Sequence, residues 1–195
     1  KKGITGAVKG ARAIPRFFYP SIRNATAAER ELIEKTLDKL PLKSVVSSEV
    51  ITINPNLAKD MNAAGLARNF FFMKPIDFDR GQLAIETFNE GTIIHEIGHT
   101  RDFSEGVLPF VGESSKAPWG KAPHVFDPFI DSPGDLYAAT NHWEDFAQSY
   151  KFFYQNPAEL QKAAPAKLEA IQKMETPGLF EKVMYRPAIR EAGKK

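Results

Sequence analysis

The stretch that decides the fold is Gly91–Asp102, which reads GTIIHEIGHTRD. It contains the pattern His-Glu-x-x-His in a segment that reads as helix, and a helix turns by about 100° per residue. His95 and His99 therefore lie about 40° apart around the axis and one turn apart along it, so their rings can bind one metal ion. Gly98 has no side chain, which allows the core to come close to the helix. The side of the helix opposite the histidines carries the apolar residues Ile93, Ile94 and Ile97.

This pattern predicts a particular chemistry. A catalytic zinc ion takes three protein ligands and keeps a fourth position for water, whose pKa it lowers toward neutrality. Glu96 neighbours the histidines without being a ligand, which suits the base that takes a proton from that water. The alternative is a helix with two merely buried histidines. However, the chain has only four histidines, and two of them stand at ligand spacing. We therefore expect a zinc peptidase with one Zn²⁺ ion.

The composition limits the other possibilities. With 195 residues, the chain is long enough for one domain with a substantial core. Its 26 basic and 24 acidic residues give a net charge of +2, which argues against nucleic acid as the main partner. Cysteine is absent, so nitrogen and oxygen atoms must hold any metal. No run reaches transmembrane length, so we expect a protein or peptide substrate and no membrane span.

The start of the chain differs in charge from the rest. The first 28 residues contain six basic residues and no acidic one. We expect residues 1–25 to form a basic lead-in segment, in which Phe17, Phe18 and Tyr19 dock on the body. Residues 26–195 would then form a single catalytic domain.

Helix and strand signals alternate in the first half. Thr26 begins a capping-box pattern, and the helix it predicts ends at Pro41. We expect strands at 45–53, which is rich in β-branched residues, and at 69–73.

Polar and apolar residues then alternate over residues 82–88, which predicts a half-buried strand. This strand leads directly into the histidine helix, so we expect an extended substrate to pair with it through Leu83, Ala84 and Ile85. Residues 104–134 have no periodicity but are rich in proline, glycine and aromatic residues. We expect a long ordered loop, with Trp119 contributing to a substrate wall.

The second half is predominantly helical. Residues 141–154 form the most regular helical pattern, and Asn156–Pro157 precedes another helix that Pro165 interrupts. The predicted fold class is α+β: a small twisted sheet, the histidine helix beneath it, and a mostly helical C-terminal half.

The third ligand has several candidates. Glu144 lies near the start of the strongest helix, although it could instead complete a capping box with Asn141. Position 105 is Glu, so the longer motif with a third histidine six residues after the second is missing. The other candidates are Asp135, which would make an aspzincin-type site, His142 and His124.

The segments 95–102, Tyr137 and 144–147 together resemble the catalytic domain of anthrax lethal factor and the clostridial Pro-Pro endopeptidases. The similarity covers roughly residues 91–174 and implies a zincin-like endopeptidase, in which His95, His99 and Glu144 are ligands. It also implies that Glu96 is the base and that the Tyr137 hydroxyl steadies the tetrahedral intermediate. Two residues depart from the family pattern: Asp145 replaces an aromatic residue, and Gln148 stands where a glutamate beside the ligands is usual.

Some roles remain open in the sequence. Tyr137 can donate a hydrogen bond to a developing oxyanion, or it can be a packed loop residue. Asp102 can orient a ligand histidine through its second N–H, or pair with a surface base. The resemblance favours a secreted bacterial protease or the toxin domain of a larger effector. The rival hypothesis is a zincin-fold protein-binding module without turnover.

Overall fold

A small mixed sheet forms one side of the molecule in the computed structural model, which describes residues 16–57, 65–68, 74–79, 88–105, 112–115, 118–119 and 137–176. Its spatial order is β1 (Ser21–Arg23), β2 (Val50–Asn54), β4 (Ile76–Asp79) and β3 (Gly65–Ala67). The pairs β1–β2 and β2–β4 are parallel, whereas β3 runs antiparallel to β4. Strand β3 is therefore an edge strand of the described sheet.

The central strands bury one face of the sheet. In β2, burial alternates along the strand, and its β-branched residues Ile51 and Ile53 are fully buried. These two residues lie in register with Ile76 and Phe78 of β4, which are also buried. The four side chains form one continuous apolar layer for the helices to cover.

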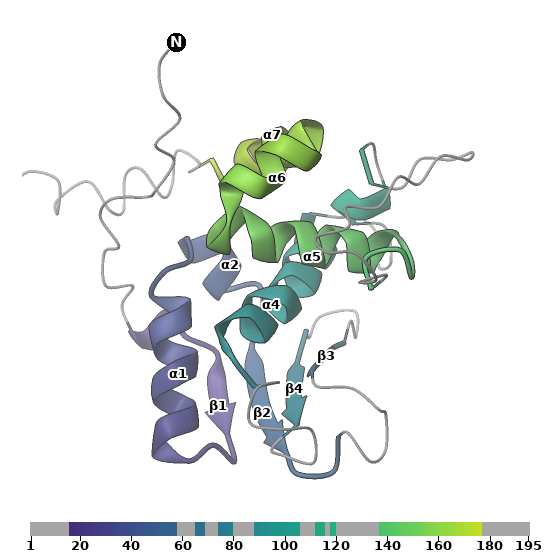
Figure 1. Ribbon diagram of the computed structural model, residues 1–195. Coiled ribbons are helices and arrows are strands. Elements are labelled where there is room, and N and C mark those ends of the chain that lie inside the picture. The colour runs from purple at the N-terminus through teal and green to yellow at the C-terminus, as the bar shows by residue number, and fades with distance from the viewer. Residues whose placement is uncertain are drawn as a thin grey trace, which may run out of the picture.

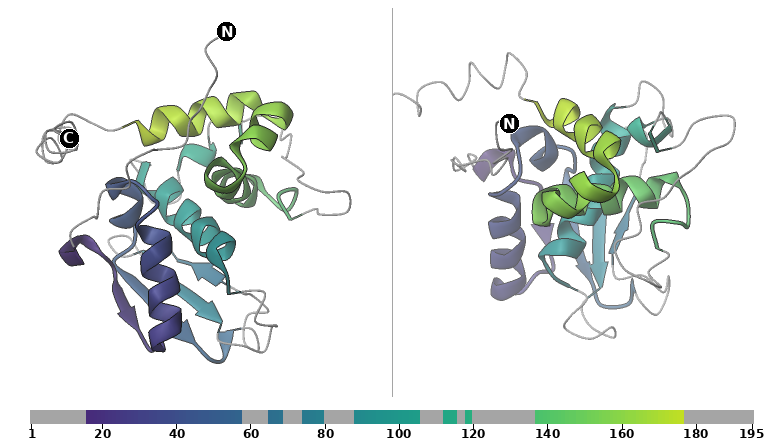
Figure 2. Two further views of the ribbon diagram at one scale, coloured as in Figure 1. Left: turned by 60° about the vertical axis from the view of Figure 1, so that its left-hand side comes forward. Right: turned by 45° about the horizontal axis from the view of Figure 1, so that its top comes forward.

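Helix α1 (Ala27–Leu37) lies beside the central helix α4 (Glu90–Glu105), and both lie on one side of the sheet (Figure 2). The predicted capping box at Thr26 is present, with Glu29 as its partner, so the start of α1 is as expected. After Pro41 the chain forms the short helix α2 (Leu42–Val45). A 3₁₀ turn, η1 (Arg16–Phe18), precedes β1.

Helix α4 lies between the sheet and α5 (His142–Gln155), as Figure 1 shows. Most described side chains in its middle are buried, polar ones included, because it has neighbours on both sides. The chain continues into α6 (Pro157–Ala163) and α7 (Pro165–Glu175), and each begins with a proline at its first turn. The predicted interruption at Pro165 is thus confirmed.

Helix α7 is joined to both helices beneath it by buried ion pairs. The Arg101 Nε atom of α4 lies 2.9 Å from a Glu175 carboxylate oxygen, and the Lys167 Nζ atom lies 2.6 Å from Asp145 Oδ2 of α5. All four side chains are almost fully buried. The C-terminal helices therefore hold α4 and α5 in a fixed relation.

Several expectations about elements need correction. The strand predicted at 45–53 begins only at Val50, because residues 42–45 form α2 instead. The lead-in segment ends earlier than residue 25, since β1 is part of the sheet and Phe18 and Tyr19 pack against the core. Phe17, by contrast, is 78% exposed. The predicted strand at 69–73 and all of the predicted strand at 82–88 except Phe88 lie outside the described residues.

The coarse prediction holds: the fold is mixed α and β, with a small four-stranded sheet and a largely helical C-terminal half. None of the described helices combines the length and the apolar character needed to cross a membrane.

Candidate metal centre

Helix α4 presents both histidines on one side. Asn89 accepts a hydrogen bond from the Thr92 amide at the start of this helix, which fixes where its first turn begins. His95 and His99 follow one turn apart, and their ring centroids are 4.8 Å from each other. Both side chains are largely buried, so solvent competes little for their ring nitrogens.

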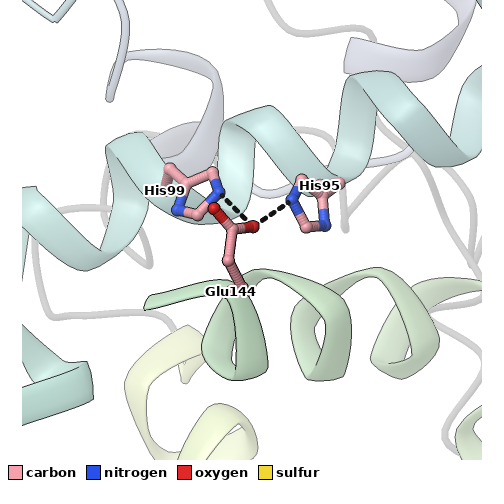
Figure 3. Close-up of side chains that lie close together, drawn as sticks. All are labelled: His95, His99 and Glu144. Atoms are coloured by element: carbon pink, nitrogen blue, oxygen red, sulfur yellow. Dashed lines mark hydrogen bonds and ion pairs between the residues drawn. The ribbon is translucent and has the colours of Figure 1, made fainter. Parts of the chain in front are cut away.

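Helix α5 brings Glu144 against this pair from a different part of the chain. One carboxylate oxygen, Oε2, lies 3.1 Å from His95 Nε2 and 3.2 Å from His99 Nε2 (Figure 3). The helix is capped by Asn141, whose side chain accepts from the amides of Trp143 and Glu144. The Glu144 carboxylate points toward the histidines. It therefore does not complete a capping box with Asn141, which was the alternative role.

The geometry of the three residues fits one metal ion. Their candidate ligand atoms all lie within 4.8 Å of one another. Two ligand atoms bound to one tetrahedral zinc ion are separated by about 3.3 Å, since each lies about 2.0–2.1 Å from the metal. The observed nitrogen–oxygen separations of 3.1 and 3.2 Å are close to this value. His95, His99 and Glu144 could therefore hold a metal ion.

The rival ligand candidates are not part of this group. His142 is described, but its ring packs against the ring of Trp143, and it lies outside the His95–His99–Glu144 group. Asp135 and His124 lie outside the described residues. Of the candidates that can be placed, Glu144 alone joins the two histidines.

A glycine allows the two helices to approach. A Cβ atom on Gly98 would lie 3.1 Å from the Ala147 Cα atom and 3.2 Å from the Tyr150 Cβ atom. These contacts are tighter than ordinary packing, so a larger side chain would push α5 away. The expectation that Gly98 permits close approach is confirmed, and the approach is what brings Glu144 within reach of both histidines.

The electrostatics of the three residues are mutually supporting. Burial alone would raise the pKa of Glu144, but hydrogen bonds and charge from His95 and His99 outweigh it and hold that pKa well below its usual range. Burial would likewise lower the pKa of His99, yet the hydrogen bond with Glu144 and the nearby carboxylates raise it. The group thus keeps Glu144 ionised at neutral pH, in the form that binds metals.

Glu96 lies beside this group and is buried. Its carboxylate oxygen Oε2 accepts a hydrogen bond of 2.8 Å from the Ala67 amide of edge strand β3. Glu96 does not belong to the ligand group formed by the described residues. This position agrees with the expectation that it neighbours the ligands without being one.

Tyr137 lies beside His95. Its ring centroid is 5.5 Å from that of His95, and the residue is about half exposed. Burial of the phenol raises its pKa, and the charges of Glu144 and Glu96 together with a hydrogen bond to Glu144 raise it further. The hydroxyl therefore stays protonated at neutral pH and can donate a hydrogen bond.

Asp102 has a partner that the sequence did not indicate. Its two carboxylate oxygens accept from the amide and the hydroxyl of Ser114, each at 2.6 Å, rather than from the ring nitrogen of a described histidine. Its charge nevertheless contributes to the raised pKa of His99. Ser114 belongs to the 3₁₀ turn η2 (Glu113–Ser115), so Asp102 anchors that turn to α4. Gln148, one turn after Glu144, is buried on α5.

The expectation for Trp119 is wrong. Its side chain is fully buried in the core, with its ring centroid 4.8 Å from that of Phe146, so it offers no surface to a substrate. Burial of the carbon surface of the indole favours this position, although its Nε1 has no hydrogen-bond partner among the described residues. The other substrate-binding residues predicted from the sequence, Leu83, Ala84 and Ile85, lie outside the described residues.

The unusual residue Asp145 is accounted for by its surroundings. Its side chain is fully buried and forms the ion pair with Lys167. An acidic residue at this position, next to Glu144, is tolerated because α7 supplies a cation to it.

In comparisons with known proteins, no family model matches the chain, and no curated protein and no solved structure matches it either. The geometry of the site is therefore the ground for assigning a function.

Proposed function

We propose that this protein is a zinc-dependent endopeptidase with a zincin-like fold. The observation that carries the proposal is the position of Glu144: a carboxylate from a separate helix lies 3.1 and 3.2 Å from the two histidines of a His-Glu-x-x-His segment. Two imidazoles and one carboxylate are a ligand set of catalytic zinc sites, which leave a further position open for water or substrate. The resemblance of this site to lethal factor and the clostridial Pro-Pro endopeptidases supports the same function.

Zinc suits this set of donors. The described group offers two nitrogen ligands and one carboxylate, and the chain has no cysteine. A bound zinc ion would polarise both a water molecule and the carbonyl of the scissile peptide bond. Magnesium and calcium, in contrast, prefer ligand sets made of oxygen atoms.

Glu96 would then transfer the proton of the attacking water, and Tyr137 would stabilise the negative charge that develops on the substrate. Glu96 would take the proton from the attacking water, because its carboxylate is buried beside the ligand group. It would pass that proton to the leaving amine as the peptide bond breaks. Tyr137 would donate a hydrogen bond to the oxygen on which negative charge develops, since its hydroxyl remains protonated.

The fold supports the proposal through the position of the sheet. Edge strand β3 packs against α4 and binds Glu96, so one edge of the described sheet lies next to the proposed catalytic base.

The test combines metal analysis with digestion of a peptide library by the purified protein. We expect the wild type to bind one zinc ion and to cut within peptides. Glu96→Gln should retain zinc and peptide binding while the rate falls by about 10²–10⁴-fold. Tyr137→Phe should lower kcat with little change in KM, because its hydrogen bond strengthens in the transition state.

Two outcomes would contradict the proposal. Undiminished cleavage by Glu96→Gln would exclude the proposed base. A wild-type protein that binds zinc and peptides but cuts nothing across a broad library would indicate a binding module instead.

A further inference from the structure

The carboxylate of Glu96 is held by the backbone of edge strand β3. In this strand, the Arg68 amide, just beyond its end, donates to the Pro75 carbonyl oxygen at 2.9 Å, toward the neighbouring chain segment. Backbone groups alternate in direction along a strand, so the preceding amide, that of Ala67, points away from β4. This outward amide is the one that donates to Glu96 Oε2 at 2.8 Å. Oε2 therefore has a hydrogen-bond partner on β3, and Oε1 is the second oxygen of the same carboxylate.

The same strand approaches Glu96 at Gly65. A Cβ atom on Gly65 would lie 2.6 Å from Glu96 Oε1, 2.7 Å from Cγ and 2.8 Å from Cδ. Atoms of these types are not found so close together, so no side chain larger than hydrogen fits while Glu96 keeps its position. Gly65 therefore forms one wall of the space that the Glu96 carboxylate occupies.

We propose that Gly65 and the Ala67 amide are positioning residues for Glu96: together they fix the orientation of the carboxylate that would take the proton, with Oε2 bound to the amide and Oε1 beside Gly65. This inference rests on the proposed function, in which Glu96 is the general base. A glutamate side chain has several rotatable bonds, and a base must be held within a fraction of an ångström to act efficiently. The hydrogen bond fixes one oxygen, and the absence of a side chain on Gly65 leaves the space that the other occupies.

A purely structural role for Gly65 would predict that Gly65→Ala mainly lowers stability, whereas a positioning role predicts that it mainly lowers the catalytic rate. The atoms that an added Cβ would meet belong to the Glu96 side chain and not to backbone. Rotation of Glu96 would relieve the clash but break its hydrogen bond to the Ala67 amide, so stability would fall by about the contribution of that one bond. Catalysis would change strongly, because the rotated atoms are the reacting ones.

The first experiment compares Gly65→Ala with Gly91→Ala. Gly91 lies in the first turn of α4, where a Cβ atom would lie 3.1 Å from Asn89 Oδ1 and from Gln155 Oε1. These atoms are the ends of side chains that can shift, unlike the backbone that faces Gly98, so Gly91→Ala is a control for adding one methyl group. We expect both variants to keep the zinc content of the wild type. Gly65→Ala should lower kcat by on the order of 10²-fold, as expected for a misplaced catalytic group. Gly91→Ala should leave it unchanged.

A rescue variant separates positioning from general damage. Aspartate is shorter than glutamate by one methylene group, so Glu96→Asp makes room for the added Cβ. We expect Glu96→Asp to cost clearly less in the Gly65→Ala background than in the wild type. Additive losses in the double variant would contradict the proposal.

Hydrogen exchange tests the contact without requiring activity. We expect the Ala67 amide to exchange about tenfold faster in Glu96→Ala, the equivalent of one lost hydrogen bond, while the Arg68 amide is unchanged. Equal exchange of Ala67 in both proteins would overturn the proposal, even if Gly65→Ala fails to fold. If the zinc-loaded wild type cuts no peptide but the exchange rate of the Ala67 amide still depends on Glu96, the proposed function is wrong and the contact between Glu96 and Ala67 is supported. Wild-type turnover by zinc-loaded Gly65→Ala would overturn the positioning role alone.

Discussion

Glu144 is the ligand candidate that joins two separate parts of the chain. His95 and His99 share one helix and would remain neighbours in an isolated peptide of that sequence. The Glu144 carboxylate reaches them only when α5 is packed against α4, and it contacts both rings through one oxygen. Metal binding should therefore depend on this single side chain more than on any other outside α4.

We expect Glu144→Ala to weaken zinc binding by more than about 100-fold. Loss of an outer partner of a metal ligand already costs about 10- to 100-fold, and loss of a ligand should cost more. The measurement is a competition titration against a chromophoric zinc chelator. His142→Ala is the control, since it lies two residues earlier on the same helix and outside the ligand group. Unchanged affinity in Glu144→Ala would rule out its role as a ligand.

At the scale of single residues, the sequence predicts what local spacing decides. The placement of His95, Glu96 and His99 follows from one helical turn, so it could be predicted from the chain alone. The Ser114 partner of Asp102 and the burial of Trp119 depend on contacts between distant segments. The Ala67 amide that holds Glu96 is a backbone group, and no side-chain pattern marks it.

Among the elements, the contact between α4 and α5 sets the geometry of the metal centre. At Gly98 the Ala147 backbone lies directly against α4. We expect Gly98→Ala to destabilise the protein by about 1–3 kcal/mol through overpacking. It should also weaken zinc binding, because Glu144 would move away from both histidines. Urea unfolding and the zinc competition titration measure the two effects, with Gly91→Ala as the glycine control. Unaltered zinc affinity in Gly98→Ala would show that Glu144 does not depend on this contact.

The ion pair between α7 and α5 allows a second prediction for an element. Lys167→Met removes the cation from the fully buried Asp145 carboxylate, which should cost about 3–5 kcal/mol in the free energy of unfolding. Replacing both residues, as in Lys167→Met with Asp145→Leu, should restore much of this stability, since no charge is then left buried. Chemical denaturation of the single and double variants tests this. A loss below 1 kcal/mol in the single variant would mean that the pair does not secure α7.

Helices were easier to predict than strands for a physical reason. Caps and prolines mark helix ends within a few residues, and Thr26 and Pro165 did so correctly. Strands β1, β3 and β4 have only three or four residues each. Such short segments are stabilised by their neighbours in the sheet, and this pairing is not visible in local sequence.

For the molecule as a whole, metal binding and folding should be coupled. The ligand group exists only in the folded protein, because it requires both α4 and α5. At a free zinc concentration of about 100 times Kd, binding adds about 2.7 kcal/mol of stability. We therefore expect a chelator to lower Tm by about 5–10 °C relative to that condition, and added zinc to reverse the change. Thermal unfolding measured by circular dichroism provides the test. Glu144→Ala should show a much smaller response, and an equal response would place the stabilising zinc elsewhere.

The short edge strand next to Glu96 has a consequence for how the protein responds to heat. β3 is three residues long and pairs with one described strand, β4. Such segments open locally at temperatures below those at which a domain unfolds as a whole. Warming would thus release the proposed base, Glu96, while the candidate ligands on the packed helices α4 and α5 stay in place. If the proposed peptidase activity is present, its rate would be highest several degrees below the melting temperature, and cooling would restore the activity lost above that optimum.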